Sequence, residues 1–476
     1  MSVSIRDAAQ IAPSQRQLAW QQLEFYGFIH FTVNTFTDRE WGLGDESPSL
    51  FNPTELNAAQ WVEACKSAGM RGLILTCKHH DGFCLWPSTH TEHSVKNSPW
   101  KNGKGDLVRE VADACRAAGL KFGIYVSPWD RHELSYGNSE AYNAFFLNQL
   151  KELLTGYGEL FCVWFDGACG EGPNGKRQVY DWEAYYGMIR ELQPNAVISV
   201  CGPDVRWCGN EAGHTRTSEW SVVPASMRDN EKIQENSQQV DDGEFAKRIG
   251  SQDEDLGSRA VLAQTDEVVW YPSEVNTSIR PGWFYHAAED DQVKSVDELA
   301  DLYERTVGGN AAFLLNVPPD KRGLIHENDV RTLRELGRRI KNGYSVNLAA
   351  GAQARASHER NDAHNARRLT DGDPSTYWCP PEGVEQAVLE LDLGSEQIFD
   401  RIVLSEYIQA GQRVERFRIE RWEEETWKPL YEGTTIGYKH ICRFAEARAR
   451  KLRIVVVESR WCPTLSRFEV YRVLQL

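Results

Sequence analysis

The chain has 476 residues and a formal net charge of -16 at pH 7, from 53 basic and 69 acidic side chains. This length predicts two or three domains, or one large barrel with a smaller module. Hydrophobic residues make up 41% of the chain, which suffices for a core and excludes bulk disorder. The acidic balance argues against a nucleic-acid partner, because neutralising phosphates needs a basic surface.

The start of the sequence contains no basic segment followed by an apolar run, and we find no transmembrane span. We therefore expect a cytoplasmic protein without a membrane partner. The 11 cysteines are scattered without a CxxC pair, mostly inside apolar runs. This pattern predicts reduced core residues rather than a disulfide framework or a zinc site.

The first 340 residues alternate between strand-like and helix-like segments. The expected strands cover residues 27–33, 72–77, 121–127, 159–166, 196–201, 267–272 and 311–317. The expected helices cover residues 57–68, 105–118, 139–154, 180–192, 296–307 and 327–340. Repeated β–α units predict a parallel sheet covered by helices. Their number favours a (β/α)8-type barrel over an open sheet.

Two helix-to-strand joints look alike, and their glycines, Gly69 and Gly119, lie 50 residues apart. Each glycine stands where a helix end needs a residue at positive φ. The long polar segment 203–266 weakly indicates one or two strands, and residues 218–223 are one candidate. A segment of this length in a compact barrel is usually a functional loop. We interpret its acidic run, residues 252–256, as a solvated face.

The pattern changes near residue 344. Strand-like segments then follow one another without helices, at residues 387–393, 400–405, 416–422, 452–457 and 467–473. Turn residues separate them, which predicts an all-β sandwich. The sequence therefore predicts an α/β protein with a catalytic barrel over residues 1–343 and a β-sandwich over residues 344–476.

Active sites of barrels lie at the carboxyl ends of their strands. The residues near and after the carboxyl ends of the expected strands combine carboxylates, imidazoles and aromatic rings, where purely structural strands would show aliphatic residues. They include His30, Glu40, Trp41, His79, His80, Tyr125, Trp164, Asp166, Glu211 and Trp283. Aromatic faces also suit sugar rings, so this set predicts a hydrolase that acts on a carbohydrate with two carboxylates.

Asp166 ends an apolar run and precedes a glycine, so it loses hydration unless partners hold it. It is either a carboxylate nucleophile or a helix N-cap. Either Glu211 or Glu219 could be its acid partner, and the other would be a loop charge. The neighbours His79 and His80 are a polar binding pair, metal ligands or packing residues. Adjacent histidines rarely converge on one ion, so we predict no catalytic metal.

Five segments resemble the strand-end motifs of glycoside hydrolase family 29, the α-L-fucosidases, in that family's order. They are residues 27–31, 40–42, 76–83, 123–127 and 163–167, and the resemblance spans residues 20–340. It implies a barrel-like catalytic domain, retention of configuration and chemistry without a metal or other cofactor. The implied substrate is a fucosylated oligosaccharide or glycoconjugate glycan.

The resemblance also assigns roles. Asp166 matches the nucleophile, and Glu40 and Trp41 match a pair near O4 of fucose. Trp283 matches an aromatic position near the C5 methyl group. The residues that match hydroxyl-binding or pocket-shaping positions are His30, His79, His80, Tyr125 and Trp164.

Two later segments, residues 206–211 and 274–283, resemble the subgroup that prefers α-1,3- and α-1,4-linked fucose on branched glycans. In that subgroup a Gly-Asn-Glu segment carries the acid/base, which points to Glu211. This leaves three classes of function: an exo-α-L-fucosidase, a metal-dependent hydrolase with His79, His80 and Asp166 as ligands, and a silent fucose-binding protein.

The C-terminal module resembles discoidin-like (F5/8 type C) domains through residues 369–378. In sugar-binding relatives such a loop can hold a structural Ca²⁺, and oxygen ligands suit that ion. The candidate ligands are Asp371, Asp373 and Thr376, and a plain Asp- and Gly-rich turn is the alternative.

Overall fold

Eight parallel strands form the central sheet of the first domain, in the order β5-β4-β3-β2-β1-β10-β9-β6. A parallel bridge between Ser199 and Val205 joins its two edges. The sheet is therefore a nearly closed barrel, and the predicted (β/α)8-type fold is confirmed. Its strands are β1 (Phe25–Ile29), β2 (Gly72–Lys78), β3 (Lys121–Val126), β4 (Cys162–Phe165), β5 (Val197–Val200), β6 (Arg206–Trp207), β9 (Ser273–Ser278) and β10 (Ala311–Asn316).

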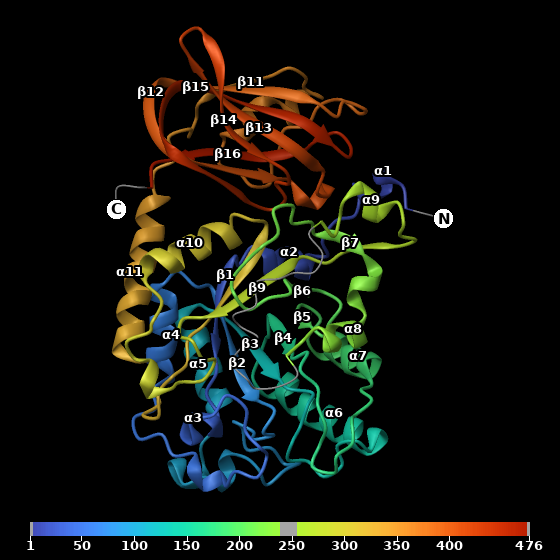
Figure 1. Cartoon of the computed structure of the whole chain (residues 1–476), viewed down its shortest axis with the longest axis vertical. Helices are drawn as coiled ribbons and strands as arrows, with labels where there is room; N and C mark the ends of the chain where they lie inside the picture. The colour runs from blue at the N-terminus through green and yellow to red at the C-terminus, as the bar shows by residue number, and fades with distance from the viewer. Residues whose placement is uncertain (1–2, 239–254, 474–476) are drawn as a thin grey trace.

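The computed structural model describes residues 3–238 and 255–473. Helices surround the barrel (Figure 1). The helices of the described residues are α1 (Ile5–Ala8), α2 (Gln15–Gln21), α3 (Val33–Thr37), α4 (Ala58–Ser67), α5 (Leu107–Ala118), α6 (Ser139–Gly156), α7 (Trp182–Leu192), α8 (Asn230–Glu235), α9 (Arg259–Leu262), α10 (Val296–Thr306) and α11 (Glu327–Gly343), of which α1 and α9 lie at the end next to the second domain. Gly69 and Gly119 have φ values of 93° and 74°, so both predicted helix ends use the conformational freedom of glycine.

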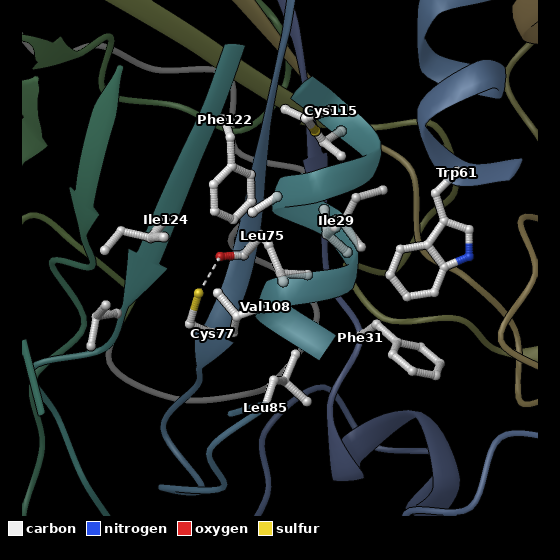
Figure 2. Close-up of a cluster of buried hydrophobic side chains, with 14 of the residues drawn as sticks. Ile29, Phe31, Trp61, Leu75, Cys77, Leu85, Val108, Cys115, Phe122 and Ile124 are labelled. Carbon is white, nitrogen blue, oxygen red and sulfur yellow. Dashed lines mark hydrogen bonds between the residues drawn. The ribbon is translucent and has the colours of Figure 1, made fainter. Parts of the chain in front are cut away.

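The core between barrel and helices is aliphatic and aromatic. Figure 2 shows Trp61 of α4, Val108 of α5, Leu75 of β2 and Ile124 of β3 in one cluster of side chains, and all four are completely buried. Each residue of β2 is buried, as expected for a parallel strand covered on both faces. This packing fixes the strands, and with them the side chains at their carboxyl ends.

The segment before β9 differs from the sequence prediction. Residues 267–272 were expected to form a barrel strand, but β8 (Val268–Trp270) pairs antiparallel with β7 (Val222–Pro224) outside the barrel. The two-residue strand β6 and the polar strand β9 complete the barrel instead. Within the run 252–256, residues 252–254 lie outside the described residues, and Leu256 is buried rather than solvated.

The second domain is an antiparallel β domain that lies on one end of the barrel domain, next to α10 and α1 (Figure 1). Two predicted strands, residues 387–393 and 400–405, are one long strand, β12. β15 pairs with both halves of β12, with register irregularities between them, whereas β11 pairs only with the first half and β16 only with the second. The domain's strands are β11 (Gln353–Ala356), β12 (Ala387–Glu406), β13 (Val414–Glu423), β14 (Thr426–Gly433), β15 (His440–Ser459) and β16 (Leu465–Tyr471).

Polar contacts join the two domains. Arg401 forms a buried ion pair with Glu304 of α10, at 3.1 Å. Gln412 accepts a hydrogen bond from the Ser221 backbone N–H at 2.7 Å and donates one to the Glu219 carbonyl at 3.0 Å. Separating the two domains would leave these buried polar groups without hydrogen-bond partners, which costs free energy. The contacts therefore hold the β domain and the 219–221 segment together.

The eleven cysteines are unpaired, and ten of them are buried. Among the described residues, no helix combines the length and apolar character needed to cross a membrane.

Candidate active site

A cavity of about 620 Å³, including its open mouth, lies at the carboxyl ends of the barrel strands. Nine of the ten predicted site residues line it: His30, Glu40, Trp41, His79, His80, Trp164, Asp166, Glu211 and Trp283. The tenth, Tyr125, is buried and donates a hydrogen bond to Asp166. The fold thus brings together residues from position 30 to position 283, because the carboxyl ends of parallel barrel strands meet on one side.

Asp166 lies directly after β4 and is held by two neighbours. Its Oδ2 accepts a hydrogen bond from Tyr125 Oη at 2.8 Å, and its Oδ1 accepts one from the Ala168 backbone N–H at 2.8 Å. Burial raises the pKa of Asp166, and these donors oppose that rise. Asp166 does not cap the helix that follows, since α7 has Asp181 as its N-cap. A carboxylate fixed in this way can attack an electrophilic carbon.

Glu211 has a different environment. Its Oε2 accepts one hydrogen bond, from Trp283 Nε1 at 3.1 Å. Burial raises the pKa of Glu211 to about 7, and the nearby charges of Asp166 and Glu40 add to the rise. A carboxyl group with this pKa can both give and take a proton near neutral pH.

Glu219, the alternative acid, lies outside the cavity. Its buried carboxylate forms an ion pair with Arg206 and lies 3.7 Å from Arg216. Of the two glutamates, Glu211 is the one that lines the cavity with Asp166. Glu219 instead anchors the segment that follows β6.

Hydrogen bonds fix the tautomer of His30. Asn316 donates from Nδ2 to the Trp283 carbonyl at 2.8 Å, so its Oδ1 must accept from His30 Nδ1, also at 2.8 Å. Burial lowers the pKa of His30 to about 4, so the ring is neutral. Its Nε2 therefore carries a lone pair.

The same argument holds for His80. Ser127 donates its hydroxyl hydrogen to the Trp129 carbonyl at 2.7 Å and so accepts from His80 Nδ1 at 2.8 Å. Burial lowers the pKa of His80 to about 3. The unprotonated Nε2 lies 3.9 Å from Asp166 Oδ2. The pocket therefore contains two neutral imidazoles that can each accept a hydrogen bond from a hydroxyl group.

His79 stacks on Tyr125, with ring centroids 5.5 Å apart, and its buried Nδ1 has no hydrogen-bond partner among the described residues. One ligand atom each from His79, His80 and Asp166 lie within 4.8 Å of one another. Two imidazoles and a carboxylate can bind a divalent transition metal. This is the part of the described chain that could hold such an ion.

The predicted aromatic residues form the walls. Trp164 stacks on Tyr125 at 5.2 Å and donates from Nε1 to Glu274 Oε1 at 2.8 Å. Trp41 packs edge-on against His80 at 5.2 Å. Burial raises the pKa of Glu274, which is completely buried, to about 7. Glu274 does not line the cavity, and its hydrogen bond to Nε1 fixes the orientation of the Trp164 ring.

Glu40 joins two loops. Its Oε2 accepts from the Trp283 backbone N–H at 2.8 Å, and its Oε1 accepts from the Phe284 N–H at 2.9 Å. His286 Nε2 lies 2.8 Å from the same Oε1. Three of about four acceptor positions are thus used within the protein, which leaves one for a ligand hydroxyl.

Sequence reasoning missed several polar residues of the site. Asn316 sets the His30 tautomer, and Asn276 lines the cavity and accepts from Trp207 Nε1 at 3.0 Å. Asn316 ends the apolar run of β10, so the strand-end criterion that selected Asp166 would also have selected it. Asn276 gave no such signal, because β9 is polar along most of its length.

The candidate calcium ligands form a turn. Thr376 Oγ1 donates to Asp371 Oδ2 at 2.7 Å, and Asp373 Oδ1 accepts from the Ser375 hydroxyl at 2.6 Å. The Arg368 guanidinium lies 3.4 Å from Asp371. Each of these side-chain oxygens already has a partner within the protein, and the partners of Asp371 include the Arg368 cation. The arrangement therefore fits a plain Asp- and Gly-rich turn better than a Ca²⁺ site.

A barrel whose strand ends gather two unlike carboxyl groups, neutral imidazoles and aromatic walls is typical of a glycoside hydrolase. Residues 14–343 match the family model for α-L-fucosidase, and residues 353–470 match the F5/8 type C domain. The chain belongs to the α-L-fucosidases of glycoside hydrolase family 29 and acts as an α-L-fucosidase.

Similar proteins cover nearly the whole chain. Alpha-L-fucosidase 1 of Arabidopsis thaliana is 41% identical over 466 residues, which are 96% of this chain and 87% of that protein. A family 29 structure from an unknown rumen bacterium is 41% identical with a TM-score of 0.79, covering 98% of this chain and 78% of that one. A Ruminococcus gnavus family 29 fucosidase in complex with fucose is 32% identical with a TM-score of 0.85, covering 98% and 96%.

Proposed function

We propose that this fucosidase is a retaining exo-enzyme that removes terminal α-1,3- and α-1,4-linked L-fucose from branched glycans. The observation that carries the mechanism is the unlike environment of two carboxyl groups in one pocket. Hydrogen-bond donors hold Asp166, whereas Glu211 has a single donor and a pKa raised by burial to about 7. Unlike pKa values assign the nucleophile and the acid to different residues.

The reaction then has two steps. Glu211 protonates the glycosidic oxygen while Asp166 attacks C1, so the C1–O bond to the glycan breaks and a fucosyl ester forms. Glu211, now ionised, takes a proton from a water molecule, which attacks C1 and releases Asp166. Two inversions give fucose with the configuration of the substrate. Glu211 ends the cycle protonated and Asp166 ionised.

Fucose recognition follows from the lining. The Nε2 lone pairs of His30 and His80 accept hydrogen bonds from sugar hydroxyls, and Glu40 offers its one remaining acceptor position. The Trp283 ring provides an apolar wall for the methyl group of a 6-deoxy sugar.

The linkage preference rests on the two segments that resemble the α-1,3/1,4 subgroup. Their strands pair in parallel, with Arg206 opposite Ser273 and Trp207 opposite Glu274. Trp207 and Asn276 both line the cavity. A neighbouring galactose of a branched glycan would contact this side, and its binding energy would then lower the barrier for cleavage.

The test compares a Lewis-type trisaccharide with an α-1,2-fucosyl lactose, with proton NMR of the first product formed. We expect much faster release of fucose from the trisaccharide, with α-fucose appearing before mutarotation. Equal rates on both substrates would refute the linkage preference, and β-fucose as first product would refute retention.

A metal-dependent hydrolysis is the second candidate, supported by the close approach of His79, His80 and Asp166. It predicts that chelation and dialysis abolish activity and that a divalent ion restores it. The two-carboxylate mechanism predicts unchanged turnover after the same treatment.

A further inference from the structure

We propose that His286 is a positioning residue of this enzyme: it holds Glu40 against the loop after β9 and thereby places Trp283 and the proton donor Glu211. The proposal rests on the proposed role of Glu211 as acid/base. His286 is not among the residues that line the cavity, so it would act through the contacts that follow.

His286 lies between two carboxylates. Its Nδ1 is 2.8 Å from Asp38 Oδ1, and its Nε2 is 2.8 Å from Glu40 Oε1. Carboxylates accept hydrogen bonds, so both ring nitrogens donate and His286 is an imidazolium. The side chain is 17% exposed, which shields these ion pairs in part from solvent. It joins the loop after β1 to the loop after β9.

The backbone is built for this contact. A Cβ atom at Gly282 would lie 2.8 Å from Glu40 Oε1 and 2.9 Å from His286 Cδ2. A side chain at this position would force Glu40 or His286 to shift. The approach brings the Trp283 and Phe284 backbone N–H groups within hydrogen-bond distance of Glu40. His286 therefore completes a set of three donors around one carboxylate.

The contacts continue to the proton donor. Trp283, placed by its backbone bond to Glu40, donates from Nε1 to Glu211 Oε2 at 3.1 Å. The charge of Glu40 is one of the causes that raise the pKa of Glu211. The His286 cation offsets that charge, so it affects both the position and the acidity of Glu211.

The charged groups that face His286 are Asp38, Glu40 and Glu289. Hydrogen bonding to Glu40 raises the pKa of His286 to about 9, with Asp38 and Glu289 adding to the rise. The imidazolium therefore persists through the range in which Glu211 titrates. Loss of the cation would leave Glu40 uncompensated and raise the pKa of Glu211 further.

The experiment compares wild type with His286→Ala and His286→Gln on two aryl fucosides, one with a poor and one with an activated leaving group. His90→Ala is the control, because His90 also lies near a carboxylate, 3.7 Å from Glu152, and does not line the cavity. We expect kcat/KM on the poor leaving group to fall roughly 10- to 100-fold in His286→Ala, because small misplacements of reacting groups cost about that much. The activated substrate, which barely needs an acid, should lose much less, and the basic limb of the pH profile should move to higher pH.

His286→Gln can donate one hydrogen bond to Glu40 but carries no charge, so it should recover part of the loss and keep the shifted pH limb. Equal losses on both substrates with an unmoved pH profile would overturn the proposal in favour of a merely structural role. A histidine ¹⁵N NMR spectrum provides a readout independent of turnover: wild type should show an imidazolium signal at pH 8 that His286→Ala lacks. A neutral ring there would also overturn the proposal. A basic limb that persists in Glu211→Ala would instead count against the proposed role of Glu211 as acid/base.

Discussion

Glu211→Ala and Glu219→Ala should affect different properties of the enzyme. The first should lower activity and leave stability unchanged, and the second should lower stability and leave activity nearly unchanged. In Glu211→Ala the proton donor and base are lost, and general acid–base catalysis contributes about 10²- to 10⁴-fold. We expect a loss of this size on a natural glycan, whose leaving oxygen needs a proton. The fold should persist, because Glu211 makes one side-chain hydrogen bond, to Trp283.

Glu219→Ala removes the partner of a buried cation. The Arg206 side chain is 4% exposed and would remain charged without Glu219. Breaking a buried ion pair costs about 3–5 kcal/mol, so the free energy of unfolding should fall by about that amount. Activity per folded molecule should stay within a small factor of wild type. Thermal or denaturant unfolding, measured beside turnover, separates the two effects.

Azide distinguishes the two roles. With an activated aryl fucoside the fucosyl ester should still form in Glu211→Ala and then wait for a base. Azide needs no base, so it should restore turnover and give a fucosyl azide of retained α configuration. Glu219→Ala should not respond. Rescue confined to Glu219→Ala would reverse the assignment, and a β-fucosyl azide from either variant would make that residue the nucleophile.

Three further outcomes follow from the site. Asp166→Asn should lower kcat by at least about 10³-fold with the fold intact, since it removes the covalent step; residual activity above a tenth of wild type would contradict this. The profile of kcat/KM against pH should be bell-shaped, falling at low pH as Asp166 is protonated and falling above about pH 7 as Glu211 ionises; in Glu211→Ala, assayed on an activated substrate, the basic limb should vanish. Gly282→Ala should displace Glu40 and lower kcat/KM while leaving the unfolding midpoint nearly unchanged. If the variant has the same kcat/KM as wild type, the loop accommodates the added methyl group without moving Glu40.

The amphipathic and apolar patterns of the sequence determined much of the barrel and the place of the site. Asp166, His79 and His80 could be selected by position alone, because each follows a buried parallel strand and such strand ends meet on one side of a barrel. The prediction of a barrel strand at residues 267–272 was wrong for a physical reason. That apolar run looks like a buried strand, whereas β9, the true barrel strand, is polar because its side chains hold Trp164 and Trp207.

Which of two equivalent side chains does the chemistry was decided by the tertiary structure. Glu211 and Glu219 lie eight positions apart in one polar segment, and their sequence context left both open. The fold gives Glu219 a buried arginine and gives Glu211 a pocket wall with one donor. The charge state of a carboxyl group depends on burial and on partners from distant strands, and local sequence specifies neither. The tautomers of His30 and His80 were decided in the same way, by hydrogen bonds to residues that only folding brings near.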